Sequence, residues 1–189
     1  MGALIAVLVI VVLLVIVVFW VVGMYNGLQR ARMRCREAWS GIDVQLKRRS
    51  SLIPNLVETV KGYAAHEKEV FEEVARARSM LDNAKGAKEA AQADNVLTGA
   101  LRSLFAVAEA YPDLKANQNF LELQRELTDT EDKIAYARQF YNTNVMSYNQ
   151  RIVTVPSSMI AGMFGFQPEE FYEAEEEARQ DVKVSFTAG

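Results

Sequence analysis

The sequence predicts an all-α protein, in which a single N-terminal transmembrane helix is followed by an antiparallel up-and-down four-helix bundle. Three observations predict this fold class. An unbroken apolar run opens the chain, and the rest is rich in Ala, Leu, Glu, Gln, Arg and Lys with apolar residues at helical spacing. The four prolines are far apart, at positions 54, 112, 156 and 168. A length of 189 residues, half of them apolar, allows one domain and an appendage.

Residues 1–24 are the expected membrane anchor. The run 3–22 contains twenty apolar residues without charge, glycine or proline. At about 1.5 Å per residue it spans ~30 Å, the thickness of the hydrocarbon core of a bilayer. A cleaved signal peptide is the alternative, but the run is long for one, no Lys or Arg precedes it and no small-residue cleavage site follows. We expect an uncleaved, single-pass span.

Four arginines set the expected orientation of this span. They are Arg30, Arg32, Arg34 and Arg36, and only Met1 and Gly2 precede the apolar run. The positive-inside rule therefore places the N-terminus outside and the bundle in the cytoplasm. These arginines are candidates for contact with anionic lipid headgroups, at about 1 kcal/mol each. Lys47, Arg48 and Arg49 stand farther along the chain and are expected at a solvated turn. Cys35, the only cysteine, is expected to be a small buried residue.

Residues 25–153 carry the apolar stripes of the predicted bundle. The second helix is expected to begin at Pro54, because proline lacks an N–H that the first turn of a helix does not need. The chain would then reverse after Ser51. The alternative is one long kinked helix, since the seven-residue phase of Trp39, Leu46 and Ile53 continues beyond the proline. Reversal is favoured because two serines precede Pro54 and four segments of similar length pack well.

Two polar segments are the expected joints of the later helices. Residues 82–95 lack large apolar side chains and include Gly86, so we expect an exposed turn that stays out of the core. Residues 111–119 combine Pro112 with candidate N-cap residues, which predicts the next turn.

Residues 154–189 are expected to form an apolar loop, a short acidic helix after Pro168 and a C-terminal tail. The loop gathers an apolar patch that is too short to span a bilayer. The patch would cap the bundle, enter the membrane interface or dock on a neighbouring subunit, and capping is favoured because a bundle end needs cover. Its members are Met159, Ile160, Met163, Phe164 and Phe166.

A polar stripe is expected on the last long helix. The pairs Tyr141-Asn142 and Tyr148-Asn149 are seven residues apart and so share one helix face, and Asn55 is the expected partner across the bundle. Two interpretations stay open. The stripe lines a polar ligand groove, or its amides bond across helices and fix their register, and the second is favoured.

Residue types needed for chemistry are sparse. His66 is the only histidine, whereas a bundle di-iron site needs two Glu-x-x-His pairs, and neither a zinc-protease motif nor a Gly-rich phosphate loop is present. We therefore expect no catalytic residue, metal, cofactor or small-molecule substrate. Nucleic acid is not an expected partner, because the net charge is −3 and basic residues cluster beside the span.

Three blocks of this sequence resemble the LemA family of bacterial membrane proteins. They are "AWSGIDVQLKRRSSLIPNLVETVKGYAAHE" (38–67), "NFLELQRELTDTEDKIAYARQFYNTNVMSYN" (119–149) and "IAGMFGFQPEEF" (160–171). The resemblance implies a short outer N-terminus, one transmembrane helix and a cytoplasmic four-helix bundle. It implies no reaction, because the family has no established enzymatic activity.

The expected function is that of a non-enzymatic scaffold at the cytoplasmic face of the bacterial inner membrane. Its expected partners are the lipid bilayer and further copies of itself, because anchoring orients copies alike and raises their effective concentration. The alternative is a binding module that recruits a partner protein or organises lipid.

Overall fold

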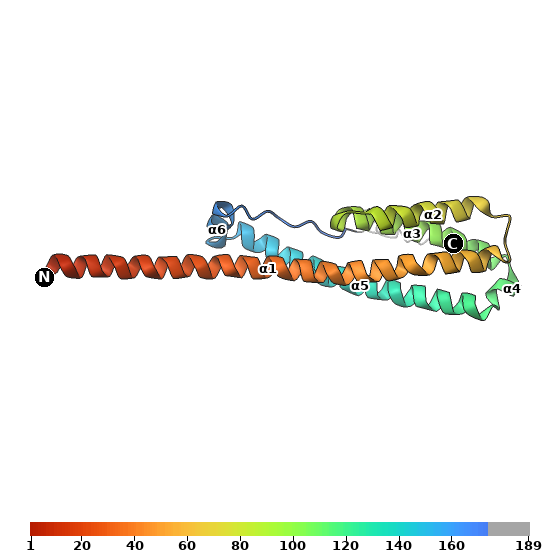
Figure 1. Cartoon of the computed structure of the whole chain (residues 1–189), viewed down its shortest axis with the longest axis horizontal. Helices are drawn as coiled ribbons and strands as arrows, with labels where there is room; N and C mark the ends of the chain where they lie inside the picture. Colours follow the sequence, from red (N-terminus) through yellow and green to blue (C-terminus); the bar gives the residue numbers. More distant parts are fainter. Residues whose placement is uncertain (174–189) are drawn as a thin grey trace, which may run out of the picture. The chain divides into compact units, whose positions relative to one another are not determined.

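The computed structural model describes residues 1–173 and confirms the all-α fold class. Helices α1, α2, α3 and α5 are joined by short connections and alternate in direction (Figure 1). The helices are α1 (Gly2–Lys61), α2 (Lys68–Asn83), α3 (Gly86–Glu109), α4 (Pro112–Lys115), α5 (Gln118–Val153) and α6 (Ser157–Met163).

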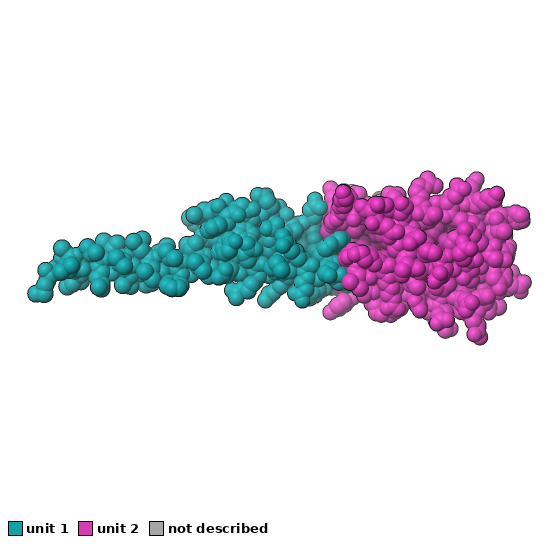
Figure 2. Space-filling model, viewed as in Figure 1, with its two compact units in different colours: residues 1–42, 137–170 teal, residues 43–136, 171–189 magenta. Residues whose placement is uncertain are grey.

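The chain divides into two compact units, which Figure 2 shows in different colours. Unit 1 holds residues 1–42 and 137–170, and so contains the first part of α1, the last part of α5, and α6. Unit 2 holds residues 43–136 and, of the described chain, 171–173. It contains the end of α1, all of α2, α3 and α4, and the first part of α5.

The predicted membrane anchor is the first part of α1. Residues 3–20 are exposed on every side of the helix. Among the described residues, α1 is the one helix long and apolar enough to cross a membrane. A helix that is apolar all round needs an apolar environment, which a bilayer supplies. Gly23 and Gly27 do not interrupt α1, so the apolar run and the arginines after it belong to one continuous helix.

The predicted reversal at Pro54 is wrong. Pro54 lies inside α1, which continues to Lys61, and the chain turns at residues 62–67. The apolar stripe explains the difference, because Ile53, Leu56 and Val60 are almost completely buried on one face of α1. Each buried side chain of this size stabilises the fold by about 1.5–3 kcal/mol, which offsets the hydrogen bond that the proline cannot make.

The core of unit 2 is built by these residues and by apolar side chains of the facing helices. The fully buried ones include Val74 of α2, Leu97 and Leu104 of α3, and Leu114 of α4. Leu127 and Ile134 of α5 are also buried.

The turn predicted over residues 82–95 is confined to its first part. Helix α3 begins at Gly86, whose φ of +78° favours glycine. The prediction that this segment stays out of the core is wrong, because Ala87, Ala90 and Ala91 are buried. Alanine is the best helix former, so a segment without large apolar residues still forms a packed helix.

The predicted joint over residues 111–119 is present. Pro112 opens α4, where a proline is tolerated at the first helical position. The Asn117 side chain then caps α5, since its Oδ1 accepts a hydrogen bond from the Phe120 N–H at 3.1 Å.

Candidate functional site

Helix α6 ends in a turn that leads into an irregular segment, residues 166–170, which we call the strap. Gly165 has a φ of +67°, the Phe166 N–H bonds the Ala161 carbonyl at 2.9 Å and the Gly165 N–H bonds the Gly162 carbonyl at 3.4 Å. These bonds form a Schellman motif, which satisfies carbonyls at the helix end and requires a left-handed residue at the glycine. The helix predicted after Pro168 does not begin within the described residues, and Glu175, Glu176 and Glu177 lie outside them.

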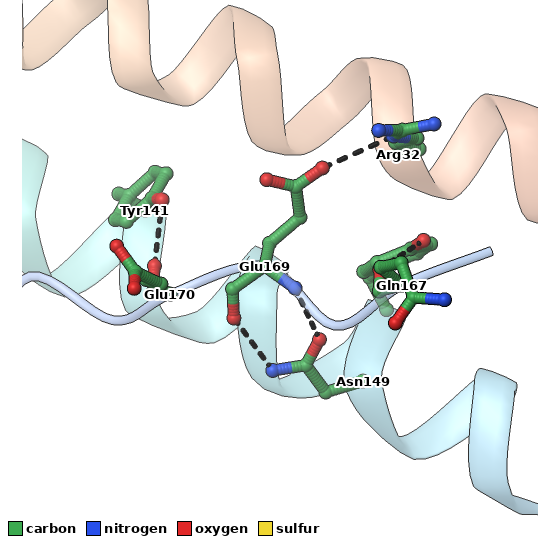
Figure 3. A network of polar contacts seen from close by, with 7 residues as sticks. Arg32, Tyr141, Asn149, Gln167, Glu169 and Glu170 are labelled. Carbon is green, nitrogen blue, oxygen red and sulfur yellow. Dashed lines mark hydrogen bonds and ion pairs between the residues drawn. The ribbon is translucent and has the colours of Figure 1, made fainter. Parts of the chain in front are cut away.

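Side chains of α5 hold the main chain of the strap (Figure 3). Asn149 bonds both main-chain polar groups of Glu169. Its Oδ1 accepts a hydrogen bond from the Glu169 N–H at 3.0 Å, and its Nδ2 donates to the Glu169 carbonyl at 2.9 Å. The Tyr148 hydroxyl donates to the Gln167 carbonyl at 2.8 Å, and the Tyr141 hydroxyl donates to the Glu170 carbonyl at 2.7 Å. Residues 167 and 169 of the strap bond Tyr148 and Asn149 near the end of α5, and residue 170 bonds Tyr141 two turns earlier, so the strap runs antiparallel to α5.

Helix α1 contributes one charged contact to the strap. Arg32 Nε donates to Glu169 Oε1 at 3.1 Å, and about a third of each side chain is exposed. A partly exposed pair of this kind contributes at most about 1 kcal/mol. Arg32, Tyr141, Tyr148 and Asn149 together form the site that we call the strap clamp.

Burial and a nearby carboxylate raise the pKa of the two clamp tyrosines. Burial, followed by the Glu169 carboxylate, raises the pKa of Tyr141 to about 12. Burial also raises the pKa of Tyr148. The shifts extend to higher pH the range in which both hydroxyls donate hydrogen bonds. The thiol of Cys35 is buried, and burial and Glu169 raise its pKa as well, which keeps it neutral.

The residues of the predicted polar stripe fall in different units. Tyr141 and Tyr148 are buried in unit 1 and Asn149 is half-buried there, all holding the strap, while Asn142 beside them is half-buried. Asn55 belongs to unit 2, where its exposed side chain lines a groove of about 430 Å³. Sequence reasoning thus found the α5 side chains but missed the strap, because main-chain groups carry no residue-specific pattern.

The other predicted site residues lie in unit 1. Arg30, Arg34 and Arg36 are exposed on α1, whereas Arg32 is half-buried against the strap. The apolar patch splits into two faces. Ile160 and Phe166 are buried, and the remaining members, Met159, Met163 and Phe164, are exposed.

A second polar cluster lies in unit 2, where the expectation of a solvated Arg49 is wrong. Arg49 Nη1 donates to Asp94 Oδ1 at 2.7 Å and Nη2 donates to Thr98 Oγ1 at 3.0 Å. The Tyr172 hydroxyl donates to Asp94 Oδ2 at 3.1 Å. The Arg49 and Asp94 side chains are only 4% and 8% exposed. We call these four residues the Arg49 network. Within residues 1–173, no three His, Cys, Asp or Glu side chains are grouped to hold a metal ion.

The fold and the clamp define a class of protein: a helical-bundle membrane protein in which the helix that carries the apolar span also helps to hold a C-terminal strap. The chain belongs to the LemA family, whose model matches residues 38–186. This match confirms the resemblance seen in the three sequence blocks.

One curated relative carries the family's name, and two others are magnetosome proteins. The chain is 30% identical to Protein LemA of Metamycoplasma hominis over 172 residues, which cover 88% of this chain and 77% of that protein. It is 25% identical to Magnetosome protein MamQ of Magnetospirillum gryphiswaldense, over 80% of this chain and 62% of that protein. It is 26% identical to Magnetosome protein MamQ 1 of Paramagnetospirillum magneticum, over 71% of this chain and 59% of that protein. The chain thus spans about three fifths of the length of these magnetosome proteins.

Replacing Asn149 with alanine is expected to release the strap. The change removes both hydrogen bonds to the main chain of Glu169, and a half-buried hydrogen bond contributes about 0.5–1.5 kcal/mol. Hydrogen exchange of the full chain should show faster exchange of the Glu169 amide. The matched control is Asn144→Ala, because the Asn144 side chain bonds only the Phe140 carbonyl of its own helix among the hydrogen bonds described. Equal exchange at Glu169 in both variants would contradict the clamp.

Proposed function

We propose that this protein is a membrane-anchored, non-enzymatic helical scaffold that self-assembles into homo-oligomers at the cytoplasmic face of the bacterial inner membrane. The observation that carries the proposal is the continuity of α1. Its apolar run, the arginines after it and Arg32 of the strap clamp belong to one helix and one unit. No loop separates the span from the clamp, so the membrane would fix the orientation of this part of every copy.

The arginines after the span support a cytoplasmic location of the bundle. Arg30, Arg34 and Arg36 are exposed within about ten to twenty ångströms of the end of the apolar run along the helix. Exposed basic residues this close to a span favour the cytoplasmic leaflet and attract its anionic lipids.

Apolar side chains on the outside of unit 1 support lateral assembly. Met33 of α1 and Phe140 and Met146 of α5 are each more than half exposed. Copies that are confined to two dimensions and oriented alike meet at a high effective concentration, so small apolar contacts are enough to hold them together.

The roles of the buried and half-buried polar groups support a structural task rather than catalysis. Tyr141, Tyr148 and Asn149 are bonded to the main chain of the strap. Arg49 and Asp94 are bonded to each other. Groups held in this way stabilise one arrangement of the chain.

The mass of the purified particle tests the assembly. We expect full-length protein in mild detergent, measured by light scattering over a range of concentrations, to form a uniform particle of several copies. Phe140→Ser should reduce that mass, and Thr143→Ser, an exposed position on the same helix, should not. A monomer at every concentration would contradict self-assembly.

Protease accessibility tests the topology separately. We expect the bundle to survive protease added outside intact spheroplasts and to be digested after lysis. Digestion in intact spheroplasts, with cytoplasmic markers preserved, would overturn the orientation.

The second candidate is a binding module that recruits a partner protein or organises lipid. The exposed apolar face of α6 favours the lipid role, because this face lies in the same unit as the span. A monomer that captures one defined partner in detergent would favour recruitment instead.

A further inference from the structure

Helix α6 has one buried face and one apolar exposed face. Ile160 and Ala161 are 3% exposed and pack into unit 1. A set of exposed apolar side chains extends along the chain from the end of α5 to the C-terminal cap of α6. Its members, each at least half exposed, are Val153, Val155, Met159, Met163 and Phe164, and we call this surface the α6 patch.

Aromatic contacts place the α6 patch beside the end of the apolar span. The Phe164 ring lies 4.9 Å from the ring of Tyr25, and the Phe166 ring lies 5.6 Å from it, both measured between centroids. Tyr25 is three residues beyond Val22, the last residue of the apolar run, which corresponds to ~4.5 Å of helix. Tyrosine is favoured at this depth, where its ring meets the boundary between hydrocarbon and headgroups.

The segment around the α6 patch suits a membrane interface chemically. Residues 152–168 carry no charged side chain. The Ser157 hydroxyl is within hydrogen-bonding distance of the Arg151 and Thr154 carbonyls, at 2.6 and 2.9 Å, and the Schellman motif satisfies carbonyls at the end of α6. If this segment entered the membrane interface, few polar groups without a hydrogen-bond partner would lose their contact with water.

We propose that the α6 patch is a second membrane contact, which enters the boundary between headgroups and acyl chains in the leaflet nearest Tyr25. The occupant of this surface is lipid, because the patch is continuous with the end of the span and α6 is far too short to cross a bilayer. The proposal rests on the anchoring proposed above. It adds a second contact to that anchoring, so that the span and the α6 patch both hold unit 1 to the membrane.

Tryptophan quenching by brominated lipid tests this contact. The chain has two tryptophans, Trp20 in the span and Trp39 beyond it. Three single-tryptophan proteins separate the possibilities. The first carries Trp39→Phe alone and reports the span through Trp20. The second and third carry Trp20→Phe and Trp39→Phe with either Met163→Trp in the patch or Met33→Trp on α1, ~16 Å beyond Val22.

The full chain is reconstituted into vesicles whose lipids are brominated near the headgroup end of the acyl chains. We expect Trp20 and the indole at position 163 to be strongly quenched with blue-shifted emission, and the indole at position 33 to be quenched several-fold less. Met163 is 76% exposed, so the substitution meets little steric resistance, and Met159→Trp repeats the measurement at a second exposed site.

Each other outcome overturns the proposal in a distinct way. Quenching of Trp20 with an unquenched, red-shifted indole at 163 would leave the anchor intact and place the patch in water. Blue-shifted but unquenched emission at 163 would mean that protein, such as a second copy, covers the patch. An unquenched Trp20 would refute the anchor itself, and the α6 contact would fall with it.

Discussion

Replacing Arg49 with methionine is expected to lower the free energy of unfolding by about 3–5 kcal/mol. Methionine fills a similar volume but cannot donate to Asp94, whose carboxylate would stay buried with the Tyr172 hydroxyl as its remaining described partner. An uncompensated buried charge is far more destabilising than the loss of a surface ion pair. Denaturant unfolding of the full chain in detergent, followed by helical circular dichroism, measures the change.

An exposed ion pair supplies the control for this prediction. Lys133 Nζ lies 2.7 Å from Asp129 Oδ2, and about half of each side chain is exposed. Lys133→Met should therefore change stability very little, because solvent screens an exposed pair. The double variant Arg49→Met with Asp94→Leu should recover much of the loss, because an apolar pair can replace a buried ion pair at little cost. If Arg49→Met is as mild as Lys133→Met, the network does not stabilise unit 2 as described.

Replacing Pro54 with alanine is expected to raise the free energy of unfolding by about 1–3 kcal/mol. Pro54 is inside α1, so it withholds the N–H that would bond the Ser50 carbonyl one turn earlier. Alanine restores that donor and is the best helix former. The gain is reduced by about 0.4–1 kcal/mol, because proline also restricts the unfolded chain. The same denaturant measurement detects the change.

Pro112 provides a matched comparison. It stands at the first position of α4, where no N–H is needed and its fixed φ suits the helix. Pro112→Ala should therefore be neutral or destabilising by up to about 1 kcal/mol. If Pro54→Ala lowers the free energy of unfolding as much as Pro112→Ala does, then residue 54 begins a helix rather than lying within one.

The span and the helical stripes could be predicted because each depends on a local pattern. Twenty apolar residues in sequence, or apolar residues every three or four positions, are visible without knowledge of the fold. The place of Pro54 cannot be predicted in this way, because its local pattern, a proline after two serines, favours a helix start. The burial of Ile53, Leu56 and Val60 on one face decided the outcome, and burial depends on helices far away in the chain.

The candidate site divides in the same way. Tyr141, Tyr148 and Asn149 were recognisable as polar residues on an apolar helix, since the seven-residue spacing puts the two Tyr-Asn pairs on one face. Their partner, the main chain of the strap, was not recognisable, because the acidic composition after Pro168 is typical of a helix. The burial of Arg49 is not predictable from local sequence, because its partner Asp94 is 45 residues away in a segment without large apolar side chains.

The strap clamp constrains sequence change unevenly. Three of its four members bind main-chain carbonyls, which every residue possesses, and the N–H of residue 169, which proline alone would lack. Many side chains are therefore compatible with positions 167 and 170. A deletion or insertion between these positions would instead move every anchored group out of register at once. Chain length along the strap should therefore vary less between relatives than residue identity does.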